Sequence, residues 1–178
     1  MSHAHSTPSI PPAAGMPDYA FTAVDVVDRF GALPVRRIRG EPPPGSATED
    51  DLVLINERGE RLCELIDGVL VEKTMGSYES LLAMRIGAIL ERLVSDGNLG
   101  VVLGSDAMLR LWGDQIRLPD VSFISWDRLP EKTVPEAAVW EVVPDLAVEV
   151  ISRGNTREEM DRKLRDYFEA GVRLVWYV

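Results

Sequence analysis

The sequence has little of what most metal and redox sites are built from. It contains one cysteine, Cys63, and two histidines, His3 and His5, among 178 residues. A single cysteine excludes an internal disulfide and is typical of a reducing compartment, so we expect a cytoplasmic protein. Because both histidines lie in a polar N-terminal stretch, a zinc site of the usual Cys/His kind and a Ser/His/Asp triad are excluded as well.

Long hydrophobic runs and an excess of basic residues are also missing. No apolar run approaches the roughly 20 residues of a membrane-spanning helix, so no membrane partner is expected. Lysine and arginine total 19 against 29 acids, which gives a net charge of −10 without a basic stripe. Tight non-specific binding to DNA is therefore not expected. The excess acid is local, because residues 41–80 carry ten acids and three bases, whereas residues 145–178 carry seven and six.

The chain divides into a tail, an N-terminal region and a core. Residues 1–20 are rich in Ser, Pro and Ala and are expected to be disordered. Residues 21–60 are expected to hold two helices, one over residues 22–30 and one that starts at Thr48, joined by a Pro-rich loop. Residues 61–178 are the expected core.

The core alternates strand and helix patterns. Asp67-Gly68 lies between two β-type runs and predicts a tight hairpin. Apolar residues at helical spacing predict helices over residues 77–95 and 156–170. This order predicts an α/β fold, a mixed β-sheet flanked by helices. The remaining predicted strands are residues 101–103, 108–112, 116–125, 146–152 and 174–178.

One carboxylate interrupts the apolar run of residues 146–152. All residues from Leu146 to Ile151 except Glu149 are apolar, so Glu149 is expected to be buried. A buried carboxylate is costly unless it is paired or binds a cation. A divalent metal ion would resolve this conflict, and a buried ion pair with an arginine is the alternative.

Two aspartates follow a proline. Pro119 has no N–H for a strand ladder, which suits a bend where Asp120 projects from the sheet. Asp120 is either a ligand for a hard cation such as Mg²⁺ or a turn residue bound to nearby amides. Asp145 lies four residues from Glu149 on one strand, roughly 13 Å away, so these two cannot share an ion. We therefore expect Asp145 to mark the strand entry.

Two further charged residues complete the candidate set. Lys163 borders the apolar face of helix 156–170, where it either reaches the sheet or extends to solvent. Glu64 lies in the first strand of the hairpin and either supports a metal site or faces water. Two acids with a lysine can hold a divalent cation and an attacking water against a phosphodiester.

These motifs occur in a recognisable order. They are Glu64-Leu-Ile-Asp-Gly68, Leu118-Pro-Asp-Val121, residues 144–152, and Lys163 followed by Tyr167 and Gly171-Val172. Over roughly residues 60–178 the chain resembles the small restriction-endonuclease-like branch of the PD-(D/E)xK nuclease superfamily. The resemblance implies a restriction-endonuclease-like core, cleavage of DNA that depends on Mg²⁺ or Mn²⁺, and a homodimer.

By this likeness each candidate takes a role. Asp120 and Glu149 match the metal-binding acids, Lys163 matches the catalytic lysine, and Glu64 matches a helper acid. The superfamily pattern places its lysine two residues after the second acid, where this chain has Ile151, so the lysine has moved to the next helix. The chain also stops before the closing hairpin expected in such proteins. The alternative function is a catalytically weak or inactive dimerising interaction module on the same scaffold.

Overall fold

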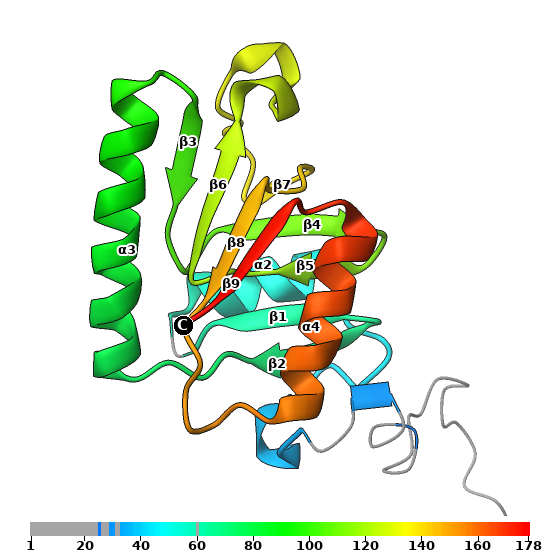
Figure 1. Ribbon diagram of the computed structural model, residues 1–178. Helices are drawn as coiled ribbons and strands as arrows, with labels where there is room; N and C mark the ends of the chain where they lie inside the picture. Colours follow the sequence, from blue (N-terminus) through cyan, green and yellow to red (C-terminus); the bar gives the residue numbers. More distant parts are fainter. Residues whose placement is uncertain (1–24, 26–28, 31–32, 60) are drawn as a thin grey trace, which may run out of the picture.

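The computed structural model describes residue 25 and residues 29–30, 33–59 and 61–178. The predicted tail and most of the predicted helix 22–30 lie outside these residues. The described core combines helices and strands (Figure 1). In chain order its elements are the 3-10 helix η1 (Val35–Arg37), α2 (Glu49–Glu57), β1 (Cys63–Ile66), β2 (Val69–Glu72), α3 (Ser77–Asp96), β3 (Gly100–Leu103), β4 (Met108–Trp112), β5 (Gln115–Arg117), β6 (Val121–Ser125), the 3-10 helices η2 (Trp126–Arg128) and η3 (Pro130–Lys132), β7 (Val139–Trp140), β8 (Leu146–Glu149), α4 (Arg157–Ala170) and β9 (Leu174–Tyr177).

The strands form two mixed sheets. One has the order β2-β1-β5-β4-β7 and the other the order β3-β6-β8-β9. In the first sheet β4 and β7 are parallel, in the second β8 and β9 are parallel, and the other pairs are antiparallel. The predicted α/β class with mixed strand directions is confirmed, although the strands divide between two sheets instead of joining one.

The division occurs within the predicted strand 116–125. Pro119 has no N–H to donate, so the β5 ladder ends at Arg117. The next residue, Asp120, donates its N–H to the carbonyl of Val148 at 2.9 Å, which begins the pairing of β6 with β8. The chain therefore crosses from one sheet to the other over residues 118–120. The two-residue strand β7, in the connection expected to be irregular, was not predicted.

The helix ends and the hairpin turn lie where the sequence predicts them. Thr48 starts α2 and Thr156 starts α4, each with a capping box in which the side chain accepts from the third helical N–H. Gly171 ends α4 in the left-handed region with φ 95°. Asp67 and Gly68 both have positive φ, as a tight two-residue hairpin requires. No helix of the described residues is long and apolar enough to cross a membrane.

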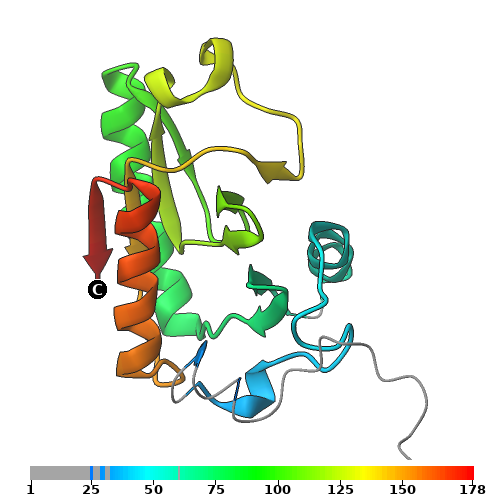
Figure 2. The same ribbon diagram turned by 90° about the vertical axis from the view of Figure 1, so that its right-hand side faces the viewer.

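Packing places α4 against both sheets. Tyr167 of α4 and the following Val172 form a buried cluster with Leu111 of β4 and Ala147 of β8. Helix α3 covers only the second sheet, where Ala83 packs with apolar residues of β6 and β8. Figures 1 and 2 show α3 along β3 and β6, and α4 beside β8 and β9. Side chains on the inner face of α4 therefore reach strands of both sheets.

Candidate functional site

Asp120 and Glu149 are brought side by side by the pairing of β6 with β8. Val121 pairs with Val148, so the same register places Asp120 next to Glu149. Directly opposed residues of an antiparallel pair point to the same face of the sheet. The N–H of Val150 donates to Oδ2 of Asp120 at 2.7 Å, which fixes that carboxylate. Both acids are buried.

Lys163 of α4 reaches the sheet and contacts two carboxylates. Its Nζ lies 3.0 Å from both oxygens of Glu149 and 3.0 Å from Oε1 of Glu64. The hydroxyl of Tyr167, one turn later, donates to Oε1 of Glu149 at 2.6 Å. Lys163 is only 4% exposed, so it does not extend to solvent. Glu149 is thus paired with a lysine and a tyrosine. The alternative of a buried ion pair with an arginine is not what the structure shows.

Glu64 is held from its other side by the end of β5. Nη1 of Arg117 donates to Oε2 of Glu64 at 2.9 Å, and the N–H of Leu118 donates to Oε1 at 3.2 Å. Nη2 of Arg117 also binds Asp166, one turn after Lys163 on α4. Arg117 is fully buried and is a central cation of the site. The sequence analysis did not identify it. The only signal for it was its place two residues before Pro119.

The two glutamates that share Lys163 respond in opposite directions. Burial raises the pKa of Glu64, but the charges of Lys163 and Arg117 outweigh it and lower this pKa to about 2. Burial also raises the pKa of Glu149, and there the attraction of Lys163 does not compensate, because Glu64 and Asp120 add repulsion. Burial lowers the pKa of Lys163, but Glu149 and Glu64 raise it above its ordinary value. Lys163 therefore stays charged between two unequal carboxylates.

Lys73 is a second lysine of the site that the sequence analysis did not identify. Its Nζ donates to the carbonyls of Leu118 at 2.6 Å and Ser105 at 3.2 Å. The same atom lies 2.9 Å from Oδ1 of Asp120, an oxygen that makes no aligned hydrogen bond. The contact is therefore mainly charge attraction. Lys73 follows directly after the fully buried strand β2, which was the available signal.

The other polar candidates lie elsewhere, as expected. Oδ2 of Asp145 accepts from the N–H of Ser125, and its Oδ1 lies 3.0 Å from Arg128, at the opposite end of β8 from Glu149. Asp67 forms the hairpin turn and also pairs with Arg162 of α4. Cys63 is buried in β1, and burial raises the pKa of its thiol to about 11. A thiol of this kind is unreactive and serves packing.

The site holds four buried acids and three buried bases. A fourth base, the partly buried Arg162, lies 3.9 Å from Asp166, so the acids do not outnumber the bases around them. Within the described residues no group of three or more Asp, Glu, His or Cys side chains is arranged to hold a metal ion. Mg²⁺ commonly binds through one or two carboxylates, with water and phosphate oxygens as its other ligands. The two adjacent carboxylates of Asp120 and Glu149 fit an ion of that kind. The acids are Glu64, Asp120, Glu149 and Asp166, and the bases are Lys73, Arg117 and Lys163.

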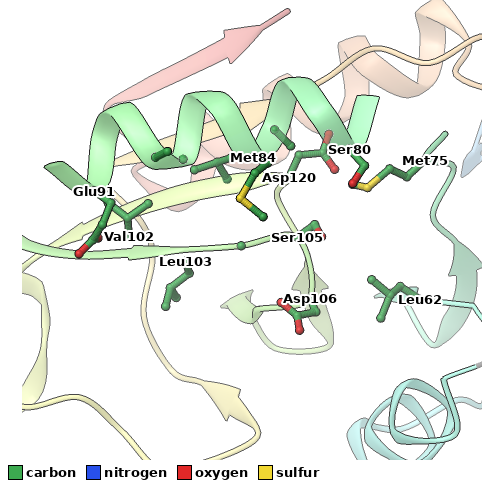
Figure 3. Close-up of a pocket in the computed structure, with 15 residues that line it drawn as sticks. Leu62, Met75, Ser80, Met84, Glu91, Val102, Leu103, Ser105, Asp106 and Asp120 are labelled. Atoms are coloured by element: carbon green, nitrogen blue, oxygen red, sulfur yellow. The ribbon is translucent and has the colours of Figure 1, made fainter. Parts of the chain in front are cut away.

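Two hollows open beside this cluster. Asp120 lines a hollow of about 730 Å³ between α3 and the segment from β3 to β4. Figure 3 shows Met84 and Met75 on one side of it and Ser105 and Asp106 on the other. Lys73 lines a second hollow of about 610 Å³. The Lys73–Asp120 pair therefore lies where an outside molecule can approach the buried acids.

Comparisons with known proteins agree with this fold. The solved structure of "a putative nuclease belonging to DUF820" from Anabaena variabilis matches with a TM-score of 0.58 and 19% sequence identity. The match covers 67% of this chain and 66% of that chain, and at 19% identity it supports the fold alone. No curated protein matches the sequence. The profile of the Uma2 family, described as "Putative restriction endonuclease", matches residues 49–178, and the chain therefore belongs to the Uma2 family.

Proposed function

We propose that this protein is a metal-dependent endonuclease that hydrolyses phosphodiester bonds of DNA. The observation that carries the proposal is the convergence of Glu64, Glu149 and Lys163 at one buried point, with Asp120 adjacent to Glu149. The three segments that supply these acids are far apart in sequence, and packing of α4 alone does not require them to meet. Membership of a family described as restriction endonucleases supports the same chemistry.

Each residue has a role that its contacts support. Asp120 and Glu149 would hold Mg²⁺ or Mn²⁺, which when bound polarises a phosphate and lowers the pKa of a water molecule. The Val150 N–H fixes Asp120 and the Tyr167 hydroxyl fixes Glu149, so both carboxylates are held in one orientation.

Lys163 supplies positive charge beside these acids. Its ammonium would stabilise the negative charge that develops on the phosphate and would orient the attacking water. Glu64 also lies 3.0 Å from the Lys163 ammonium and would hold it beside Glu149, which is a supporting role.

Nicking of supercoiled plasmid DNA tests the proposal. We expect the wild-type protein to convert supercoiled DNA to open circles with Mg²⁺ or Mn²⁺ and to lose this activity with EDTA. Asp120→Asn and Glu149→Gln keep the shape of each side chain but remove its charge. Each variant should lower the rate by at least about a hundredfold, by analogy with the loss of a preorganised catalytic group.

Asp145→Asn is the matched control, because Asp145 also follows a proline but lies at the opposite end of β8. This variant should keep most of the wild-type nicking rate. Thermal melting with Mn²⁺ separates the enzyme from the interaction module. Stabilisation of the wild type that is absent in Asp120→Asn supports the enzyme, whereas no nicking and no stabilisation at millimolar Mn²⁺ would support the module.

A homodimer is a further part of the proposal. It rests on the resemblance stated above, and several large apolar side chains of α3 are exposed. Sedimentation at micromolar concentration tests it, and a purely monomeric distribution would contradict it.

A further inference from the structure

The hollow beside Asp120 has a mostly apolar lining. One wall is the side of α3 that carries Met84, and the other is formed by β3 and the turn with Ser105 and Asp106 (Figure 3). Leu62 and Met75 lie at the end nearest β1 and β2. Most of this lining is aliphatic or thioether, so the hollow favours an apolar surface.

The charges in this hollow are all of one sign. Among the described residues that line it, Glu91, Asp106 and Asp120 are acidic and none is basic. Such a surface repels a phosphate and offers acceptors to N–H groups. A nucleobase has this combination, because it is flat and apolar on its faces and carries N–H donors on its edge.

The second hollow has the opposite character. It is lined by Arg61, Lys73 and Arg153 together with the single acid Glu79. Basic side chains of this kind bind phosphate oxygens. The two hollows share Leu62 and Met75 in their walls, so they adjoin.

The Lys73–Asp120 pair lies at the junction of the two hollows. Asp120 lines the acidic, apolar hollow and Lys73 lines the basic one, and their charged atoms are 2.9 Å apart. A nucleotide chain that crosses this junction would place a base on one side and a phosphate on the other. The candidate metal-binding acid would then lie between them.

We propose that the acidic, apolar hollow binds one unpaired base of single-stranded DNA, while the basic hollow binds an adjacent phosphate. This inference rests on the proposed function and specifies its substrate class. A base in a duplex is stacked and paired, so it can enter a hollow of this kind only after leaving the helix. The net charge of −10 also disfavours binding along a duplex backbone, whose charge density is higher than that of a single strand.

Fluorescence anisotropy with three labelled DNAs tests the inference. The probes are a single strand of about 12 nucleotides, its duplex, and a base-free strand with the same backbone charge. Titrations use Ca²⁺ as the divalent ion, and a gel confirms that the DNA remains intact. We expect the single strand to bind at least about tenfold more tightly than either other probe.

Ala88 and Ile89 of α3 provide a matched pair of variants. Ala88 is exposed and lines the hollow, whereas Ile89 is 63% exposed and does not line it. Ala88→Phe fills the hollow and should weaken binding of the single strand about tenfold. Ile89→Phe adds a similar ring to the same helix and should leave the affinity unchanged, and melting curves check that both variants fold.

The outcomes separate this inference from the proposed function. Equal binding of duplex or base-free DNA, or wild-type affinity in Ala88→Phe, overturns the inference even if plasmid nicking depends on Asp120. Base-dependent binding that is lost in Ala88→Phe supports the inference. If the wild-type protein shows this binding but nicks no DNA, only the proposed catalysis fails. Failure of all three probes to bind overturns the inference as well.

Discussion

Helix α4 takes part in two buried ion clusters that differ in their charge balance. At its first turn, Glu159 forms a two-point pair with Arg37, with distances of 2.8 and 2.7 Å, and Arg37 also donates to the carbonyl of Glu72. One turn later, Lys163 is shared by Glu64 and Glu149. The first cluster has one acid for one base, whereas in the second two acids share one lysine.

The pKa shifts report this difference. Burial raises the pKa of Glu159, but Arg37 outweighs it and lowers this pKa below the ordinary value. In the Lys163 cluster the pKa of Glu64 falls while that of Glu149 rises. Carboxyl groups with opposite pKa shifts occur in catalytic sites and also in structural ion networks. The predictions below therefore test whether the Lys163 cluster differs from the Arg37–Glu159 pair in its response to a metal ion.

The largest effect is expected from Lys163→Met. This change leaves two buried carboxylates without their shared cation, which should lower the free energy of unfolding by about 4 kcal/mol. Mn²⁺ should restore part of that stability, because it can replace the lost positive charge near Glu149. Urea titrations with and without Mn²⁺ measure both effects, and a loss that Mn²⁺ does not reduce would contradict the comparison.

Glu159→Gln should cost about 3 kcal/mol, because Arg37 loses its buried charged partner. Glutamine can still take part in the capping box of α4, so the helix start is preserved. Mn²⁺ should not recover this loss, and the rate of plasmid nicking should stay near wild type. Recovery by Mn²⁺ would show that the two clusters are not independent.

Acid should weaken the Lys163 cluster below pH 4.5. A carboxyl group whose folded pKa is lowered stabilises the fold above its unfolded pKa, and this contribution is lost as the pH falls through the folded value. For Glu64 the window runs from 4.5 to about 2, which corresponds to about 3 kcal/mol. The raised pKa of Glu149 acts only above pH 4.5, where it adds stability as the pH falls, so it does not reduce the loss expected below pH 4.5. Urea titrations across this pH range measure the loss of stability. They use the Glu159→Gln variant, in which the Arg37–Glu159 pair no longer contributes.

The smallest effect is expected from Thr156→Ala, which removes the side chain that accepts from the Glu159 N–H at 3.2 Å. Loss of such a cap costs about 1 kcal/mol. Thr48→Ala removes the equivalent cap of α2 and is the matched control. Both should lower the melting temperature to a similar extent, and only Thr156→Ala should reduce the stability that Arg37 and Glu159 contribute. If the loss of stability in each cap variant adds in full to the loss in Glu159→Gln, this prediction is contradicted.

The sequence predicts the local parts of the site well. The burial of Glu149 follows from its apolar neighbours, whereas the helical spacing places Lys163 at the edge of the apolar face, from which it could reach either the sheet or solvent. The structure brings Glu64, Glu149 and Lys163 together and places Asp120 beside them, while their catalytic roles stay predictions. Local periodicity is enough here because each residue is placed by its own strand or helix.

The cations Arg117 and Lys73 could not be identified in this way. Arg117 ends a strand of three residues, too short for a pattern, and its partners come from β1 and α4. Lys73 binds carbonyls of two distant loops. Such contacts depend on how the strands divide between two sheets, and strand pairing over long sequence distances leaves little trace in local periodicity. The same reason explains why one sheet was predicted where two exist.

The passage of residues 118–120 between the sheets has a consequence for the folding protein. Asp120 belongs to the second sheet, whereas the carbonyl of Leu118 and the carboxylate of Glu64 belong to the neighbourhood of the first. A chain in which either sheet has not yet formed holds only some of the charged groups. The full set of charged groups in the site therefore comes together only when both sheets are in place.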